Sequence, residues 1–353
     1  MPRWSRSVPI FLKTRPGPRA RLFLQRILQE QVPFAGSFIC VCFPGVPMTP
    51  AIRPQSVHNR LFSEQNIFVG LCILPAVLFL GVFLYYPIVE TFRLSFMRAS
   101  GLGGETFIGI QNYKSLAGDP EFQAGLINVF SWAFWSIVIQ IPLSFFIAFS
   151  LTFYVNRLTK PLRAIYYLAN VLPSAITAML GKFVFSPNNG ILASLGEAFG
   201  WTWLTSIDFL GDKNVAFWTV FTVATWTYTG FPIIYLMSRI EQIPTEIKEA
   251  AELDGVTGWR YAFSIVLPDL GYPMRILAVL CTIGSLKLFD LPYMMTTGGP
   301  GNATVTLGIT LYRHGFINWQ YGKASAIGVV IFLLSLVFTI VQFSWQSREG
   351  DVK

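Results

Sequence analysis

The sequence predicts an all-α protein that crosses a membrane several times. Of its 353 residues, 53% are hydrophobic and only 12% are charged, and the mean hydropathy is +0.53. A soluble domain normally has about 25% charged residues. In addition, charge-free runs recur that reach the roughly 20 residues a membrane helix needs. Apolar residues can face outward in such a chain because lipid, rather than water, surrounds them.

We expect six membrane-spanning helices. Five charge-free runs are long enough, at 65–89, 122–156, 164–181, 214–238 and 324–347. The second run is too long for one bilayer crossing, so we place a helix near 125–152 and leave both ends at the interface. A sixth span, over about 270–294, is interrupted by Arg275, Lys287 and Asp290.

The loop charges orient these spans. The loop at 153–163 contains Arg157, Lys160 and Arg163 and no acid, and an excess of Lys and Arg marks the cytoplasmic side. The loops at 90–121, 183–213 and 295–322 are then external. The loop at 239–269 and both termini are cytoplasmic, and the acids in that loop count little in this rule.

The amino-terminal region is basic and has no assigned function. Residues 1–60 contain nine Lys and Arg and one acid, Glu30, which beside long apolar runs indicates the cytoplasmic side rather than nucleic-acid binding. Residues 31–52 lack charge but contain four prolines, so we expect a signal-like segment, a disordered tail, or translation that begins at Met48. The expected division is a tail at 1–65, a transmembrane domain at 66–347 and a cytoplasmic tail at 348–353.

The most informative motif lies in the cytoplasmic loop between the fourth and fifth spans. Residues 243–268 read IPTEIKEAAELDGVTGWRYAFSIVLP. Pro244 suits the first turn of a helix and Gly255 its left-handed end. Thr257 can cap a second short helix, and Pro268 favours a break before the next span. The pattern predicts two short helices joined by a sharp turn, which by itself fits an ordinary amphipathic hairpin equally well.

The order of residues in this motif resembles the cytoplasmic signature of binding-protein-dependent ABC permeases. That signature is Glu-Ala-Ala, three residues, Gly, nine residues, Ile, one residue, Leu-Pro. Its positions are occupied here by Glu249, Ala250, Ala251, Gly255, Ile265, Leu267 and Pro268. Segments 107–113 and 289–300 are similar to other parts of sugar permeases, so the resemblance extends over roughly 67–347. It is closest to the disaccharide, oligosaccharide and glycerol-phosphate branch.

The resemblance implies that residues 243–268 are a coupling helix that docks into a groove of a separate ATPase. Glu249 would pair with a basic group of the ATPase, and Ala250 and Ala251 would allow close packing. Gly255 would make the turn, and Asp254 would lie at the rim. The implied partners are a second homologous permease, two ATPase subunits, an extracytoplasmic solute-binding protein and membrane lipid. ATP would be bound by the ATPase, with no cofactor in this chain, and the location would be a bacterial or archaeal cytoplasmic membrane.

A path for a polar solute is expected where spans are broken near mid-depth. Gly230 and Pro232 flank Phe231 in the fourth span, and Pro173 lies between polar residues of the third. By resemblance to the maltose-type permease, the positions that align with its sugar contacts are Asn170, Ser174, Trp226, Thr227, Phe231, Gly284, Ser285 and Leu288. Helix packing or an interfacial aromatic belt would equally explain Trp226 and Phe231.

Two charged residues of the fifth span allow two interpretations. Lys287 and Asp290 are three residues apart, so they could pair on a helix. Charges inside a membrane are costly and usually functional. The alternative is that the two residues mark the outer end of the span and face water, and the sequence favours this alternative.

Other classes of protein lack support in the sequence. No Gly-x-x-x-x-Gly-Lys-Ser/Thr loop is present to bind a nucleotide. An ion-driven secondary transporter usually has acids or histidines inside its spans, whereas His58 and His314 both lie outside the predicted core. We expect no catalytic activity and no metal site, because two distant histidines and four cysteines without metal spacing form no such constellation. An isolated channel would leave the coupling motif unexplained.

We therefore predict the permease subunit of an ATP-driven importer for a sugar or an oligosaccharide. Glycerol-phosphate or another polar solute is the alternative. A phosphate dianion would favour a pocket with arginines. The sequence places only one arginine, Arg275, near the interior of a predicted span, and therefore favours a sugar. Receptor contacts are expected near Phe107–Tyr113 and Asn302–Trp319.

Overall fold

The computed structural model describes residues 64–101, 103–154, 159–187 and 189–350. The chain divides into two compact units, Met1–Gly70 and Leu71–Lys353, and the second unit is described here. The expectations for the amino-terminal tail, including its charge-free stretch and the start at Met48, lie outside the described residues, as do residues 351–353.

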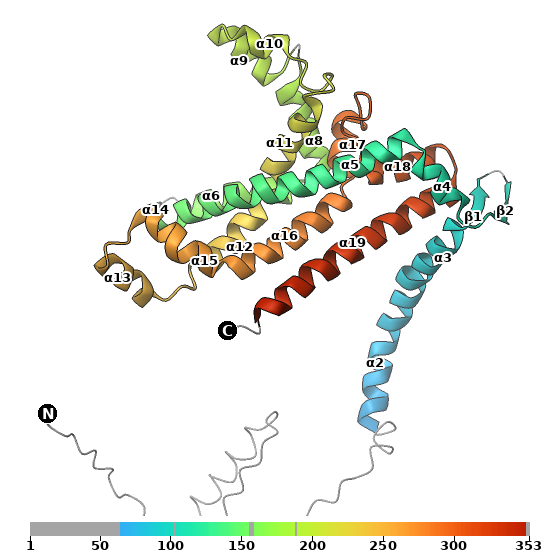
Figure 1. The fold of residues 1–353 in the computed structure, drawn as a ribbon, viewed down its shortest axis with the longest axis horizontal. Coiled ribbons are helices and arrows are strands. Elements are labelled where there is room, and N and C mark those ends of the chain that lie inside the picture. Colours follow the sequence, from blue (N-terminus) through green and yellow to red (C-terminus); the bar gives the residue numbers. More distant parts are fainter. Residues whose placement is uncertain (1–63, 102, 155–158, 188, 351–353) are drawn as a thin grey trace, which may run out of the picture. The chain divides into compact units, whose positions relative to one another are not determined.

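Helices make up most of the described chain (Figure 1). In chain order, the helices are α2 (Glu64–Leu80), η2 (Gly81–Tyr85), α3 (Tyr86–Ser95), α4 (Gln111–Ala117), α5 (Pro120–Trp135), η3 (Ser136–Gln140), α6 (Ile141–Phe153), α7 (Thr159–Val171), α8 (Ser174–Phe185), α9 (Ile191–Phe199), α10 (Thr202–Ser206), α11 (Ala216–Tyr228), α12 (Gly230–Ile240), α13 (Thr245–Leu253), α14 (Gly258–Tyr261), η4 (Ala262–Val266), α15 (Leu267–Asp269), α16 (Gly271–Leu286), α17 (Asp290–Thr296), α18 (Leu307–Tyr312), η5 (Arg313–Ile317) and α19 (Tyr321–Gly350). The elements labelled η are π-helical turns. The prediction of an all-α polytopic fold is confirmed.

Three continuous helices are long and apolar enough to cross a membrane: Phe68–Ser95, Pro120–Phe153 and Tyr321–Gln342. Three bent helix pairs pass the same test, and their halves meet at 100° (α7 and α8), 43° (α11 and α12) and 71° (Gly258–Asp269 and α16). If each bent pair is one span, the described residues contain six, as the sequence predicts. The sequence did not predict how strongly the third span bends.

The bends occur where the backbone cannot continue a regular helix. Pro173 is the N-cap residue of α8, with an extended ψ of 138°, because proline lacks the N–H that the preceding turn would use. Gly230 begins α12, and a Cβ there would lie 2.5 Å from the carbonyl oxygen of Tyr166. Glycine therefore lets the backbones of α12 and α7 approach closely. The third break follows Pro268 and falls at Leu270, between α15 and α16.

The long helices pack side by side in the second unit. Helix α12 packs on α6 and α7, α16 packs on α5 and α19, and α19 packs on α3; Figure 1 shows α16 lying alongside the line of α5 and α6. Fully buried side chains such as Phe145, Leu236 and Leu277 form a core between α6, α12 and α16. A second core, around Trp132, Phe221 and Leu291, borders the site described below.

A short hairpin departs from the helical pattern. Strands β1 (Met97–Ser100) and β2 (Gly103–Phe107) pair antiparallel, with Met97 opposite Phe107. The amide of Asn112 donates to the carbonyls of Ser95 and Met97, at 2.8 and 2.9 Å. The backbone N–H of Gly101 donates to the carbonyl of Trp319 at 3.1 Å. These bonds bring the 107–113 and 302–319 segments, far apart in the sequence, to one region.

Candidate functional site

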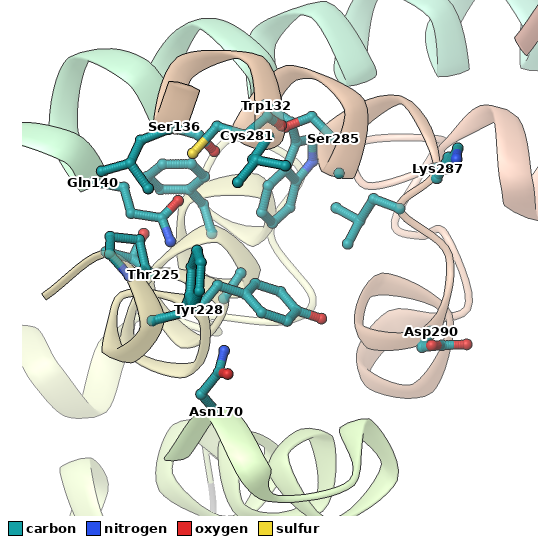
Figure 2. A pocket seen from close by; sticks show the side chains of 18 of the residues that line it. Trp132, Ser136, Gln140, Asn170, Thr225, Tyr228, Cys281, Ser285, Lys287 and Asp290 are labelled. Carbon is teal, nitrogen blue, oxygen red and sulfur yellow. The ribbon is translucent and has the colours of Figure 1, made fainter. Parts of the chain in front are cut away.

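A cavity of about 410 Å³ lies among several of these helices (Figure 2). Its walls come from α5 and η3, from the break between α11 and α12, from α16 and the segment after it, and from the end of α7. Its lining residues are Trp132, Ser136, Gln140, Asn170, Phe221, Ala224, Thr225, Tyr228, Phe231, Pro232, Leu277, Leu280, Cys281, Gly284, Ser285, Lys287, Leu288, Phe289 and Asp290. A cavity of this size, with convergent polar groups among apolar ones, is typical of a small-ligand site.

The helix breaks shape this cavity. The side-chain amide of Asn170, near the end of α7, donates to the carbonyl of Thr227, near the end of α11, at 3.4 Å. Tyr228 and Phe231 lie on either side of the α11–α12 break, and both line the cavity. A continuous helix would place residues three apart on one face, whereas here the 43° bend changes the direction of the chain between the two rings.

The lining is aromatic and mostly neutral, with two charges at one end. Figure 2 shows Lys287 and Asp290 together on one side of the cavity, away from Gln140 and Thr225. The described residues that line it contain one lysine, one aspartate and no arginine. The arrangement suits a neutral ligand with hydroxyl groups and an apolar face more than a dianion.

The structure brings some of the predicted pathway residues together. Asn170, Phe231, Gly284, Ser285 and Leu288 all line the cavity. The hydroxyl of Ser285 donates to the carbonyl of Cys281 at 2.8 Å, which leaves the lone pairs of its oxygen to accept. The role of these five residues remains a prediction.

Ser174, Trp226 and Thr227 are not among the residues that line this cavity. Trp226 is 51% exposed and faces a second, more open groove of about 420 Å³, which Trp218 and Tyr166 also line. The hydroxyl of Thr227 is buried and donates to the carbonyl of Val223 at 2.8 Å. Trp226 therefore lies on a different face of α11 from the one that borders the cavity.

Lys287 and Asp290 do not share a helix, so they do not pair at the three-residue helical spacing, and the alternative that the sequence favours holds. Lys287 is the C-cap residue of α16, and Asp290 begins α17 after a break at Phe289, where φ is −139° and ψ is −58°. Among the described residues, no ion pair joins them. Both are exposed, in agreement with a position at the end of the span.

The sequence prediction missed the wall formed by α5 and η3. Trp132, Ser136 and Gln140 line the cavity, each less than a tenth exposed. An available signal was the four-residue spacing of these polar groups within the charge-free run at 122–156, since such spacing places side chains on one helix face. A buried polar group without a partner costs about 1–3 kcal/mol, so polar residues in an apolar span indicate a site.

The coupling motif forms the expected two short helices. Pro244 is the N-cap residue of α13, and the chain turns at Gly255, whose φ is +73°. Thr257 occupies the N-cap position of α14, although its side chain makes no capping hydrogen bond. The second helix then continues through η4 and α15 to the break after Pro268.

The motif has an exposed face and a face that packs within the chain. Glu249, Ala250, Asp254, Gly255 and Pro268 are exposed. Leu253, between them, is 90% exposed. Ala251, by contrast, is 4% exposed and belongs to the core around α6 and α12, and Ile265 and Leu267 pack against that core. Of the two alanines expected to allow close packing with a partner, only Ala250 is free to do so.

Comparison with known proteins identifies the family. Residues 140–348 match the family described as "Binding-protein-dependent transport system inner membrane component". The chain is 33% identical over 287 residues to the probable ABC transporter permease protein YurN of Bacillus subtilis (strain 168), which covers 81% of this chain and 98% of YurN. It is 32% identical over 277 residues to the multiple sugar-binding transport system permease protein MsmF of Streptococcus mutans, which covers 78% of this chain and 93% of MsmF.

A solved structure has the same fold. It is the crystal structure of a bacterial ABC transporter involved in the import of the acidic polysaccharide alginate, with a TM-score of 0.71 at 21% identity, over 81% of this chain and 96% of that chain. The family match covers the coupling motif and the cavity-lining residues from Gln140 onward. The chain belongs to the family of binding-protein-dependent transport system inner membrane components.

Proposed function

We propose that this chain is a permease subunit that carries a neutral sugar or oligosaccharide into the cell, with ATP hydrolysis supplied by a separate ATPase. The observation that carries the proposal is the cavity at the helix breaks, with its aromatic and neutral polar lining, in a chain of this family. The printed name of MsmF, a multiple sugar-binding transport system permease, agrees with a sugar as solute. In this proposal, the chain itself is not an enzyme and binds no cofactor.

The aromatic rings support a sugar as the solute. Sugars have apolar ring faces and polar hydroxyl edges, and pockets bind such ligands with aromatic surfaces and a few placed polar groups. Phe231 and Tyr228 supply rings, and Asn170 and Ser285 supply polar atoms. We place the solute among Asn170, Phe231, Gly284, Ser285 and Leu288.

The coupling motif supports transmission of force from an ATPase. Glu249, Asp254 and Leu253 form an exposed surface on α13, while Ala251 anchors that helix to the core around α6 and α12. A displacement of α13 by the ATPase would therefore be transmitted to the spans through packed side chains rather than through a flexible loop. Helices α12 and α16, which line the cavity, contribute side chains to the same core.

The external receptor is proposed to dock where the 107–113 and 302–319 segments adjoin. This region exposes large apolar side chains, among them Phe107, Ile110, Phe316 and Trp319. Both termini and α13 are proposed to be cytoplasmic. Labelling of single-cysteine variants in intact cells tests this, since Thr245→Cys should be protected from an impermeant reagent and Thr297→Cys should react.

Transport by the assembled complex tests the function. The tagged chain, purified from its own cells with its bound partners, would be reconstituted into proteoliposomes with ATP inside and the receptor outside. We expect uptake of a radiolabelled neutral sugar from a panel of maltose, trehalose and arabino-oligosaccharides, and no uptake with a non-hydrolysable ATP analogue. Uptake of glycerol-phosphate alone, or uptake driven by an ion gradient without ATP, would contradict the proposal.

A further inference from the structure

One wall of the cavity has hydrogen-bonding groups that the protein leaves unused. Trp132, Ser136 and Gln140 follow one another at four-residue intervals along α5 and η3, and their exposed fractions are 2%, 7% and 6%. All three line the cavity, and Figure 2 shows them together on one side of it, with Tyr228 and Asn170 across from them.

The π-helical turn keeps these three side chains on one face. In a regular α-helix, a residue four positions later lies about 40° further round the axis, so three such residues would spiral away from one line. Ser136–Gln140 is a π-helical turn, which contains more residues per turn and so offsets this drift. Such π-turns occur frequently at functional sites.

The polar atoms of this wall have no partner within the described part of the chain. The indole N–H of Trp132 is buried without a hydrogen bond, and so is the hydroxyl of Thr225, which lines the same cavity from α11. Among the described residues, neither the hydroxyl of Ser136 nor the side-chain amide of Gln140 makes a hydrogen bond; the hydroxyl of Ser144 donates to the backbone carbonyl of Gln140 instead, at 2.6 Å. Native proteins leave few buried polar groups without a partner. Two such groups at one cavity, beside the unbonded side chains of Ser136 and Gln140, indicate a bound ligand.

We propose that Trp132, Ser136 and Gln140 form a hydrogen-bonding wall for the hydroxyl groups of the transported sugar, and that Gln140 determines specificity. The inference rests on the proposed function and names residues on a span for which the sequence predicted none. The Gln140 amide offers two donors and an acceptor, which matches adjacent hydroxyls that both donate and accept. The Trp132 indole adds one donor, and the rings of Tyr228 and Phe231 can cover the apolar face of the sugar.

The first experiment measures uptake kinetics in the reconstituted complex, with the neutral sugar that the wild type transports best. Gln140→Met keeps the length of the side chain and removes its polar atoms, and Trp132→Phe keeps a ring and removes the N–H. We expect each variant to raise KM about tenfold, the factor for one lost hydrogen bond of about 1.4 kcal/mol. Val138→Ala is the matched control, because Val138 lies in the same π-turn but is 46% exposed and does not line the cavity.

The second experiment uses monodeoxy analogues of that sugar. It distinguishes a direct contact between Gln140 and a sugar hydroxyl from a role of Gln140 in helix packing alone. In the wild type, one analogue should lose about tenfold in kcat/KM, because it lacks the hydroxyl that Gln140 binds. In Gln140→Met, the same analogue should lose little further, since its partner is already gone. A variant that only loosens the helix would still discriminate between sugar and analogue.

The outcomes distinguish the two proposals. If the wild type transports a neutral sugar while both variants keep its KM and its discrimination among analogues, the wall binds only water and this inference is overturned. If the wild type transports no neutral sugar, the proposed function fails first. Should Gln140→Met fail to assemble, Trp132→Phe and the analogue series still decide the matter.

Discussion

The side-chain amide of Asn170 donates to the backbone carbonyl of Thr227 at 3.4 Å, and so joins the two helix breaks that border the cavity. Asn170 precedes the 100° bend between α7 and α8, and Thr227 precedes the 43° bend between α11 and α12. Backbone groups freed at a break inside a membrane need partners from neighbouring side chains. The Asn170 side chain supplies such a partner, from one broken span to the other.

Gly230→Ala should separate the two helices that meet at these breaks. The added Cβ would lie 2.5 Å from the carbonyl oxygen of Tyr166 and 3.2 Å from the Cα of Tyr167, and backbone atoms cannot rotate away. Overpacking of this kind costs about 1–3 kcal/mol. We expect a lower melting temperature in detergent and reduced uptake. Gly271→Ala is the control, because a Cβ there meets nothing within 4 Å; equal melting temperatures for the two variants would refute the close approach.

Asn128→Ala should loosen the turn that follows α17. The Asn128 amide donates to the carbonyls of Asn302 and Val305, at 3.0 and 2.8 Å. Loss of both bonds leaves two carbonyls without this donor, which should lower the free energy of unfolding by about 1–3 kcal/mol. Thermal unfolding should show this loss, whereas Ser131→Ala, whose exposed hydroxyl bonds only within its own helix, should change stability by less than about 0.5 kcal/mol. An unchanged melting temperature for Asn128→Ala would exclude a stabilising role.

Gly255→Val should disturb the turn of the coupling motif by backbone strain alone. The φ of Gly255 is +73°, and a Cβ there meets no atom within 4 Å. A left-handed conformation costs other residues about 1–2 kcal/mol, and more for a β-branched one. We expect the variant to insert into the membrane but to hydrolyse ATP without matching uptake. Gly255→Asn, which tolerates this conformation, should retain coupling, and equal coupling in both variants would remove the turn from the mechanism.

Phe231→Ala and Trp226→Ala together test which face of the fourth span meets the solute. Phe231 lines the cavity, whereas Trp226 lines the more open groove. Because we place the solute in the cavity, Phe231→Ala should raise the KM for sugar uptake more than Trp226→Ala does, with both complexes assembled. A larger effect at Trp226 would instead locate the solute in the groove.

The sequence by itself determined the class of fold and the two short helices, joined by a turn, of residues 243–268, and it predicted six spans. The spans can be predicted because hydropathy is a property of each stretch of sequence, whatever it later packs against. The signature from Glu249 to Pro268 is also local, because its turn depends on the backbone freedom of one residue, Gly255. Pro173 and Gly230 likewise marked the breaks, because proline and glycine act on the chain locally.

Only the tertiary structure decided which faces of the helices meet. Trp226 and Phe231 are five residues apart in one span, yet the bend at Gly230 and the packing of α12 on α7 place them at different cavities. One wall of the cavity consists of Trp132, Ser136 and Gln140. These side chains share a face because of the π-turn, and they line a cavity because α11 and α16 lie opposite. Helix rotation and bend angle depend on contacts between residues far apart in the chain, and a periodicity read along one helix does not contain them.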